Sequence, residues 1–142
     1  MFLPDVNILV HAHREDSQHH TLCRSWLISV LESDRSYGMA DLVLSAFLRI
    51  VTHPRILNPP SPRTAALAFV DEVRNRPHCV PVTPGPRHWD IFLRLLEQSK
   101  ATGNLIPDAF LAALAIESGS IFATLDQDYR RFPGLRWEAP SL

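Results

Sequence analysis

The chain has 142 residues, a formal net charge of −1 and 46% hydrophobic residues. These values are typical of one globular domain and exclude disordered, collagen-like and coiled-coil chains, while the near-neutral charge argues against a strong non-specific polyanion binder. No apolar run approaches the roughly 20 residues of a membrane span, and no basic and apolar leader precedes Asp5, so we expect neither a membrane anchor nor a signal peptide. Cys23 and Cys79 form no spacing motif, which favours a reducing cytoplasmic setting.

The first third of the chain is predicted to contain two strands and the helices that follow them. Phe2-Leu3 is predicted as a first strand that ends at Asp5, which is also a candidate cap for the next helix. Apolar residues spaced i, i+3, i+4 and i+7 predict a helix over residues 19–31. Tyr37 to Ala40 is predicted as a second short strand, and Asp41 follows it as the expected N-cap of another helix.

The helix after Asp41 is apolar on more than one side. Val43, Ala46, Phe47 and Ile50 form one stripe, and Leu44, Leu48 and Val51 extend it to other faces. Such a helix is buried on two sides or lies in an interface. We therefore expect part of residues 42–51 in a homodimer contact.

The remaining elements alternate between helices and strands. A loop over residues 54–62 contains four prolines, and Ser61-Pro62 is the expected start of the next helix. The other predicted elements are a strand over residues 79–82, a helix around residues 89–96, a helix over residues 108–117 opened by Pro107 and closed by Gly119, a strand over residues 121–124 and an edge strand over residues 134–137. This alternation predicts an α/β fold, a single domain over residues 1–142 with a short parallel sheet flanked by helices.

Three aspartates are predicted at one edge of that sheet. Asp5 and Asp126 follow strands, and Asp108 opens the most apolar helix of the chain. Because parallel sheets place ligands at the carboxyl ends of their strands, we expect these carboxylates to converge. A Mg²⁺ ion would offset their mutual repulsion and would support hydrolysis of phosphodiester bonds.

Each acid also has a structural interpretation. Asp5 is a candidate helix cap, and Asp128 is a candidate turn residue before Tyr129, whereas Asp108 beside so apolar a helix favours a site. Arg130 and Arg131 are candidates for contacts with a substrate phosphate, although a solvated face is the simpler interpretation. The histidine pairs lack the further spaced ligands of a zinc site, and no glycine-rich phosphate loop is present.

With these residues assembled, the sequence resembles the PIN-domain ribonucleases of the VapC type, the toxins of bacterial type II toxin–antitoxin pairs. The segments that carry the resemblance are Leu3-Pro4-Asp5-Val6-Asn7, Phe47-Leu48-Arg49-Ile50-Val51-Thr52-His53-Pro54, Ile106-Pro107-Asp108-Ala109 and Thr124-Leu125-Asp126-Gln127-Asp128-Tyr129. The segments occur in the family's order over essentially the whole chain.

The resemblance implies a compact α/β PIN fold and cleavage of RNA that depends on Mg²⁺, or on Mn²⁺ as a substitute. It also implies a homodimer and inhibition by a cognate antitoxin protein. By motif, Asp5 and Asp108 match the metal-binding aspartates and Asp126 matches a further acid of the site. Asp128 lies beside Asp126, and Asn7 matches the polar residue two positions after the first acid.

One departure from the family pattern concerns a second acid. The family usually carries a glutamate within the helix after the second strand, where this chain reads Leu44-Ser45-Ala46. Asp41 at the head of that helix is the nearest substitute. The missing acid motivates an alternative hypothesis, a non-catalytic PIN-like module that binds RNA or protein.

Two other Mg²⁺-dependent α/β classes fit poorly. A receiver domain needs a pair of acids near the start and a lysine after a late strand, and here Asp5 stands alone while Lys100 precedes a glycine break. A haloacid-dehalogenase-type phosphatase needs Asp-x-Asp after the first strand, and the second position is Asn7.

Overall fold

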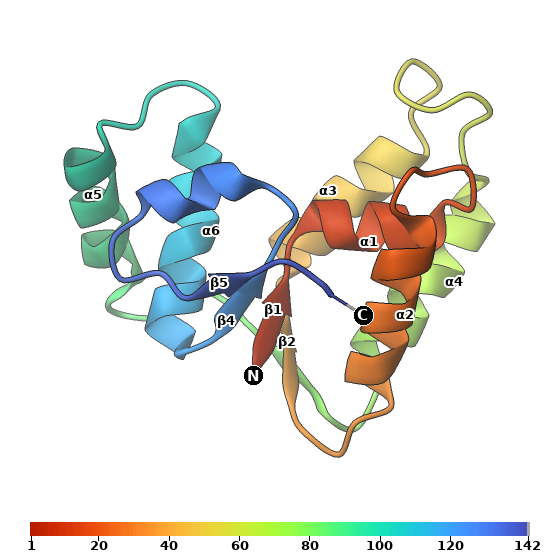
Figure 1. Cartoon of the computed structure of the whole chain (residues 1–142), viewed down its shortest axis with the longest axis horizontal. Helices are drawn as coiled ribbons and strands as arrows, with labels where there is room; N and C mark the ends of the chain where they lie inside the picture. The colour runs from red at the N-terminus through yellow and green to blue at the C-terminus, as the bar shows by residue number, and fades with distance from the viewer. Residues whose placement is uncertain (142) are drawn as a thin grey trace.

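A computed structural model describes residues 1–141, in which short strands alternate with helices (Figure 1). The elements in chain order are β1 (Phe2–Pro4), α1 (Val6–His13), α2 (His20–Leu31), β2 (Tyr37–Met39), α3 (Asp41–Val51), α4 (Arg63–Arg74), β3 (Cys79–Pro81), α5 (His88–Ser99), α6 (Leu105–Ser118), β4 (Ile121–Ala123), the 3₁₀ turn η1 (Gln127–Arg131) and β5 (Trp137–Glu138). The α/β fold expected from the sequence is confirmed.

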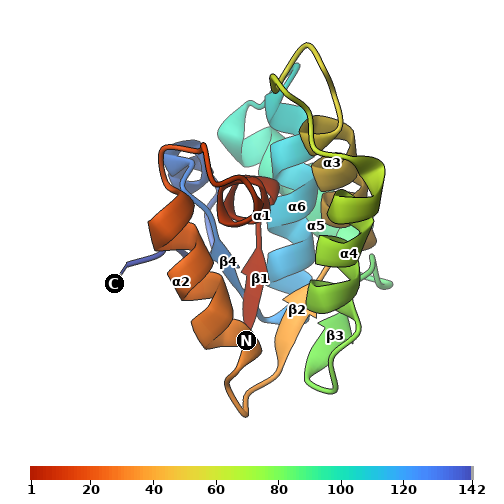
Figure 2. The same cartoon turned by 90° about the vertical axis from the view of Figure 1, so that its right-hand side faces the viewer.

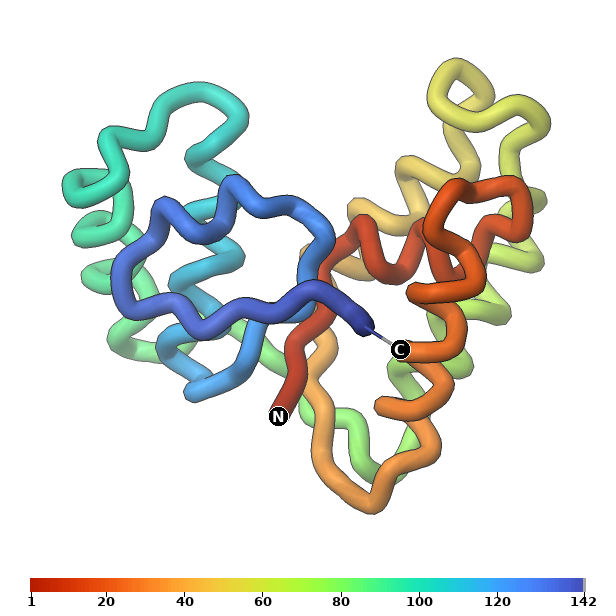
Figure 3. Tube along the Cα trace, viewed as in Figure 1, coloured from red at the N-terminus to blue at the C-terminus, as the bar shows by residue number. Residues whose placement is uncertain are grey.

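The strands form two small parallel sheets that lie beside each other. One has the order β1-β4-β5, and the other pairs β2 with β3. Phe2 pairs with Ile121 and Pro4 with Ala123, so the first strand lies beside a strand from the last quarter of the chain (Figure 3). β1 contacts β2, and Figure 2 shows the two strands side by side. Because β1 and β4 pair in parallel, their carboxyl ends lie together.

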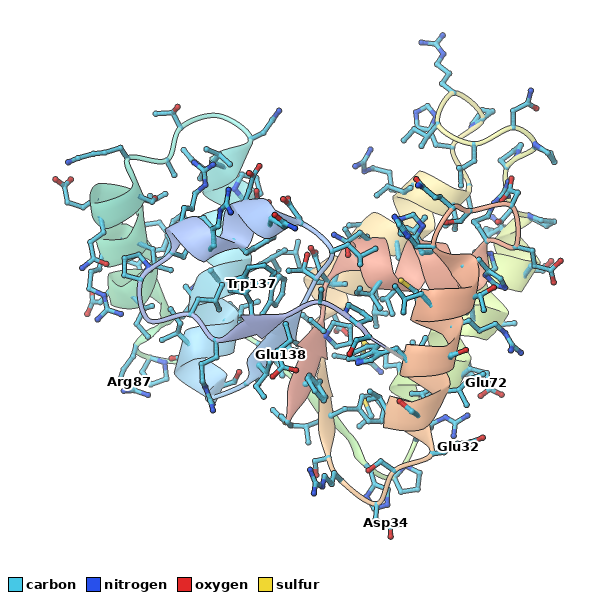
Figure 4. The ribbon with its side chains drawn as sticks, viewed as in Figure 1. Glu32, Asp34, Glu72, Arg87, Trp137 and Glu138 are labelled. Carbon is cyan, nitrogen blue, oxygen red and sulfur yellow. The ribbon has the colours of Figure 1, made fainter. Side chains whose placement is uncertain are left out.

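Helices cover the strands on both sides, as the sequence predicted. Figure 1 shows α5 and α6 on one side and α1 to α4 on the other. Four alanines of α6 are buried (Ala109, Ala112, Ala113 and Ala115). Their small side chains let the helix backbone approach the sheet closely, which fixes where the first turn of α6 lies. The outer strand β5 carries Trp137 and Glu138, which are labelled in Figure 4.

Three helices start at other positions than the sequence predicted. Asp41 is the first residue of α3 rather than its cap, and Ala40 holds the cap position. α4 begins at Arg63 after Pro62, and the Ser61 hydroxyl instead accepts a 3.2 Å hydrogen bond from Arg14. α6 begins at Leu105, before the expected Pro107, because proline is accommodated in a first turn whose N–H groups have no helical partner.

The apolar character of α3 is only partly explained by burial. Val43, Leu44, Phe47 and Val51 are buried, whereas Leu42 is 53% exposed. The exposed Leu42 is consistent with the interface that the sequence predicts for this helix. Within residues 1–141, no helix combines the length and the apolar character needed to cross a bilayer.

Candidate active site

Asp5 lies at the carboxyl end of β1, where its backbone N–H donates a 2.8 Å hydrogen bond to the Ala123 carbonyl of β4. Its side chain has two functions. Oδ1 accepts a 2.7 Å hydrogen bond from the Val6 N–H and caps α1. Oδ2 accepts hydrogen bonds from Asn7 and Thr124. The capping interpretation is therefore correct, and it does not remove Asp5 from the site.

Asn7 and Thr124 connect the ends of β1 and β4. The Thr124 hydroxyl donates to Asp5 Oδ2 over 2.7 Å, and Asn7 Nδ2 donates to the same oxygen over 3.1 Å. Asn7 Oδ1 accepts from the Leu125 N–H at 3.2 Å. Asn7 thus binds both strand ends and fixes the orientation of the Asp5 carboxylate.

Asp126 is held at the turn that follows β4. Its N–H donates to Thr124 Oγ1 over 3.0 Å, and its Oδ1 accepts from the Asp128 N–H at 2.9 Å. Asp126 therefore caps η1, and its charge also acts on Asp5 and Asp108. Asp128 is exposed, and its Oδ1 lies 3.7 Å from Arg131 Nη2.

Asp108 lies in the first turn of α6, where the helix dipole favours a negative charge. Its Oδ1 accepts a 3.2 Å hydrogen bond from the hydroxyl of Tyr129, which is 2% exposed. The next residue, Ala109, is fully buried in the core and anchors this turn. Asp108 thus comes to the site from α6, 103 residues after Asp5 in the sequence.

Electrostatics show that three of the acids lie close together. Burial is the main reason that the pKa of Asp5 is raised from 3.8 to about 6, and the charges of Asp108 and Asp126 raise it further. Burial also raises the pKa of Asp108, again with help from the charge of Asp126. Mutual repulsion between carboxylates in a shared site has this effect. Asp5, Asp108 and Asp126 therefore lie near enough for their charges to act on one another.

This donor set suits a hard divalent cation. Mg²⁺ binds oxygen ligands and commonly takes one or two protein carboxylates together with water and substrate phosphate. Among residues 1–141, no three His, Cys, Asp or Glu side chains are placed to hold one ion together. Asp5 and Asp108 fit an open site of this type, in which water and substrate complete the coordination.

Asp41 has a different partner from the other acids. It forms a 2.9 Å ion pair with Arg74 of α4, and that guanidinium lowers its pKa. The charges that raise the pKa of Asp5 come instead from Asp108 and Asp126. In α3, the positions where the family carries a glutamate hold the buried Leu44 and the exposed Ser45. Neither residue can replace the missing acid.

Two basic candidates flank the site on η1. Arg130 is exposed, and Arg131 Nε donates a 3.0 Å hydrogen bond to the Asp128 carbonyl. The positive charge of Arg131 partly opposes the rise in the pKa of Asp108 that burial causes. Arg131 therefore acts electrostatically on the acids from the adjacent turn.

The sequence analysis missed the functions of Thr124 and Tyr129. Both side chains are buried, at 0% and 2% exposure, yet each directs a hydroxyl at a carboxylate. A threonine that ends a strand next to an acid was a usable signal for Thr124. The hydroxyl of Tyr129 gave none, because a tyrosine after Asp128 is equally consistent with a core aromatic residue.

Comparison with known proteins places the fold and the sequence in one group. A model of the PIN domain family matches residues 2–135. Ribonuclease VapC25 of Mycobacterium tuberculosis is 42% identical over 142 residues, which is 100% of both chains. Ribonuclease VapC31 of the same species is also 42% identical, again over 100% of both chains.

Solved structures share the architecture at lower identity. VapBC2 from Rickettsia felis, bound to a DNA fragment from its promoter, has a TM-score of 0.71 at 17% identity and covers 99% of this chain and 98% of its own. VapC20 of Mycobacterium tuberculosis, described as a sarcin-ricin-loop-cleaving toxin, has a TM-score of 0.66 at 13% identity. The match covers 96% of this chain and 99% of VapC20. At these identities, the structures support the fold alone.

Proposed function

Because the chain belongs to the PIN domain family, we propose that it is a divalent-metal-dependent endoribonuclease and the toxin of a toxin–antitoxin pair. The observation that carries this proposal is the convergence of Asp5, Asp108 and Asp126, with the pKa of Asp5 raised to about 6. Full-length relatives named VapC ribonucleases support the same activity.

Placing acids together in this way costs folding free energy. At an effective dielectric constant near 20, two unit charges 4 Å apart repel by roughly 4 kcal/mol before relaxation and proton uptake reduce the figure. Functional sites tolerate such a cost because the groups are needed for chemistry. A module that only binds RNA would be expected to present cations to the phosphates instead.

The residues divide the work of hydrolysis as follows. Asp5 and Asp108 would hold Mg²⁺, or Mn²⁺ in its place, and the bound cation would stabilise negative charge that develops on the phosphoryl group. Thr124 and Asn7 keep Asp5 Oδ2 oriented by hydrogen bonds. Asp126, fixed through Oδ1 by the Asp128 N–H, provides a third carboxylate that orients the attacking water and accepts its proton.

The substrate and partners follow from the same proposal. Arg130 and Arg131 lie one turn from the acids and would contact RNA phosphates, for which guanidinium groups are well suited. The resemblance to VapC-type toxins implies a cognate antitoxin and a homodimer, and relatives named VapC ribonucleases support that resemblance, so we propose both partners here. We also propose that the protein acts in the cytoplasm, where both free thiols, Cys23 and Cys79, would stay reduced.

Cleavage of single-stranded RNA by the purified protein tests the proposal. We expect endonucleolytic fragments in Mg²⁺ or Mn²⁺, loss of cleavage in EDTA and recovery when excess metal is restored. Binding of RNA without cleavage under all these conditions would favour the non-catalytic module, the alternative raised by the missing acid at positions 44–46.

A further inference from the structure

We propose that Tyr129 is a positioning residue, whose hydroxyl fixes one oxygen of the Asp108 carboxylate so that the other is presented to the cation. This inference rests on the proposed function, because it assigns Tyr129 to the metal site of that activity. The hydrogen bond runs from the Tyr129 hydroxyl to Asp108 Oδ1 and is 3.2 Å long.

The ring of Tyr129 is immobilised by its neighbours. Its side chain is 2% exposed, and its ring centroid lies 4.6 Å from that of Phe122 and 5.8 Å from that of Phe132. Phe122 belongs to β4, so the ring is held against the central sheet. A hydroxyl on so fixed a ring has one direction available, and it is directed at Asp108.

The hydroxyl lies among carboxylates and remains a donor. Burial raises the pKa of the Tyr129 phenol far above its usual value, and the charges of Asp5, Asp108 and Asp126 raise it further. The phenol therefore keeps its proton throughout the range in which the enzyme would work. It supplies a neutral donor at a position where a lysine would compete with the cation by its charge.

The benefit of this contact lies in orientation. Asp108 is attached to the first turn of α6 and reaches the site with a carboxylate that would otherwise rotate. Hydrogen bonds to metal-binding carboxylates hold them in the binding geometry, and loss of such partners typically costs 10- to 100-fold in metal affinity. Thr124 and Asn7 provide this support for Asp5, and Tyr129 provides it for Asp108.

A direct metal titration of Tyr129→Phe tests the inference, since phenylalanine keeps the ring and removes only the hydroxyl. The matched control is Tyr37→Phe, because Tyr37 is equally buried and its hydroxyl donates a 2.7 Å hydrogen bond to the Val73 carbonyl. Free Mn²⁺ is followed by electron paramagnetic resonance while the ion alone is added to each protein. Melting curves in EDTA establish that each variant is folded.

We expect Tyr129→Phe to weaken Mn²⁺ binding by about 10- to 100-fold and Tyr37→Phe to leave it unchanged. In RNA cleavage, the half-saturating Mg²⁺ concentration of Tyr129→Phe should rise in parallel, while the rate at saturating Mg²⁺ falls less than about threefold, because the metal-binding atoms are all retained. A purely structural function would lower the melting temperature of both variants and spare the metal affinity of both.

Two outcomes would overturn the inference, and they are distinguishable. If wild type binds Mn²⁺ and Tyr129→Phe binds it within a factor of about three, the positioning function is wrong while the proposed nuclease stands. If wild type itself neither binds Mn²⁺ nor cleaves RNA, the proposed function fails and the inference fails with it.

Discussion

The hydroxyl of Thr124 donates a 2.7 Å hydrogen bond to Asp5 Oδ2 across a sequence separation of 119 residues. The same oxygen atom of Thr124 accepts from Asn7 Nδ2 at 3.1 Å and from the Asp126 N–H at 3.0 Å. Thr124 is fully buried. One hydroxyl therefore joins the residues that follow β1 to those that follow β4.

Replacing this hydroxyl should disrupt the site. Thr124→Val keeps the shape but removes one of the donors to Asp5 Oδ2 and the acceptor of the Asp126 N–H. Leaving such a group unsatisfied typically costs about 1–3 kcal/mol. We expect lower stability in urea titrations and at least about tenfold slower RNA cleavage. Thr124→Ser is the matched variant that retains the hydroxyl, and its cleavage rate should stay near that of wild type. Equal activity in both variants would be inconsistent with this network.

Neutralising Asp108 should stabilise the metal-free protein. Burial and the charge of Asp126 raise the pKa of Asp108, so its ionised form is unfavourable in the folded state. In Asp108→Asn, the amide oxygen still accepts from Tyr129, and the repulsion is gone. We expect a higher melting temperature in EDTA, by about 2–4 °C for each kcal/mol of repulsion removed. Mg²⁺ should stabilise wild type and do less for the variant. A variant that melts below wild type in EDTA would instead identify Asp108 as a structural residue.

The raised pKa of Asp5 predicts a pH dependence with a definite sign. The ordinary pKa of an aspartate is 3.8, and the pKa of Asp5 in the folded protein is about 6. Between these two pH values, Asp5 is protonated in the folded metal-free protein and ionised in the unfolded chain. The free energy of unfolding should therefore fall as the pH rises through this window, by an amount on the order of 3 kcal/mol.

Urea unfolding of wild type and Asp5→Asn in EDTA from about pH 4 to pH 7 measures this effect. The other titratable groups are common to both proteins, so the difference between the two curves reports the charge of Asp5. We expect wild type to lose stability relative to Asp5→Asn as the pH rises. Parallel curves would mean that Asp5 is not buried among charges.

The fold was largely predictable because the spacing of apolar residues and the residues that end helices and strands are visible in the sequence. The apolar stripe of α2, the glycine that closes α6 and the aspartates after β1 and β4 each correspond to an observed feature. Helix starts were less predictable. Asp41 and Ser61 both suit a cap, and at these positions contacts with Arg74 and Arg14 determine the side-chain geometry instead.

The site was predictable as a set of acids but not as a geometry. The positions of Asp5, Asp108 and Asp126 after strands and at a helix start imply convergence. No periodicity shows that one oxygen of Asp5 caps α1 while the other binds Thr124. The contact between Tyr129 and Asp108 joins two elements whose relative placement depends on packing of α6 against the sheet.

The exposed part of α3 predicts self-association. Leu42 of α3 is 53% exposed, and Leu67 of the adjacent α4 is 47% exposed. We expect light scattering at tens of micromolar to give about twice the chain mass of 16.1 kDa, and Leu42→Glu to return it to the monomer value, because a buried unpaired charge is costly. The comparison variant is Trp89→Glu on α5, where the side chain is 59% exposed. A monomeric wild type would contradict the dimer, and dissociation only by Trp89→Glu would place the contact on α5.

The most direct test of the proposed activity is RNA cleavage by wild type, Asp108→Asn and a matched control in Mg²⁺ and in EDTA. Asp90→Asn is that control, because Asp90 occupies the first turn of α5 as Asp108 occupies the first turn of α6. We predict metal-dependent cleavage by wild type and Asp90→Asn, and a loss of about 100-fold or more in Asp108→Asn, the typical effect of removing a group that acts on the transition state. Retention of more than about a tenth of wild-type activity in folded Asp108→Asn would contradict the assignment of Asp108 to the metal site. Cleavage by wild type that persists undiminished in EDTA would contradict the metal-dependent mechanism itself.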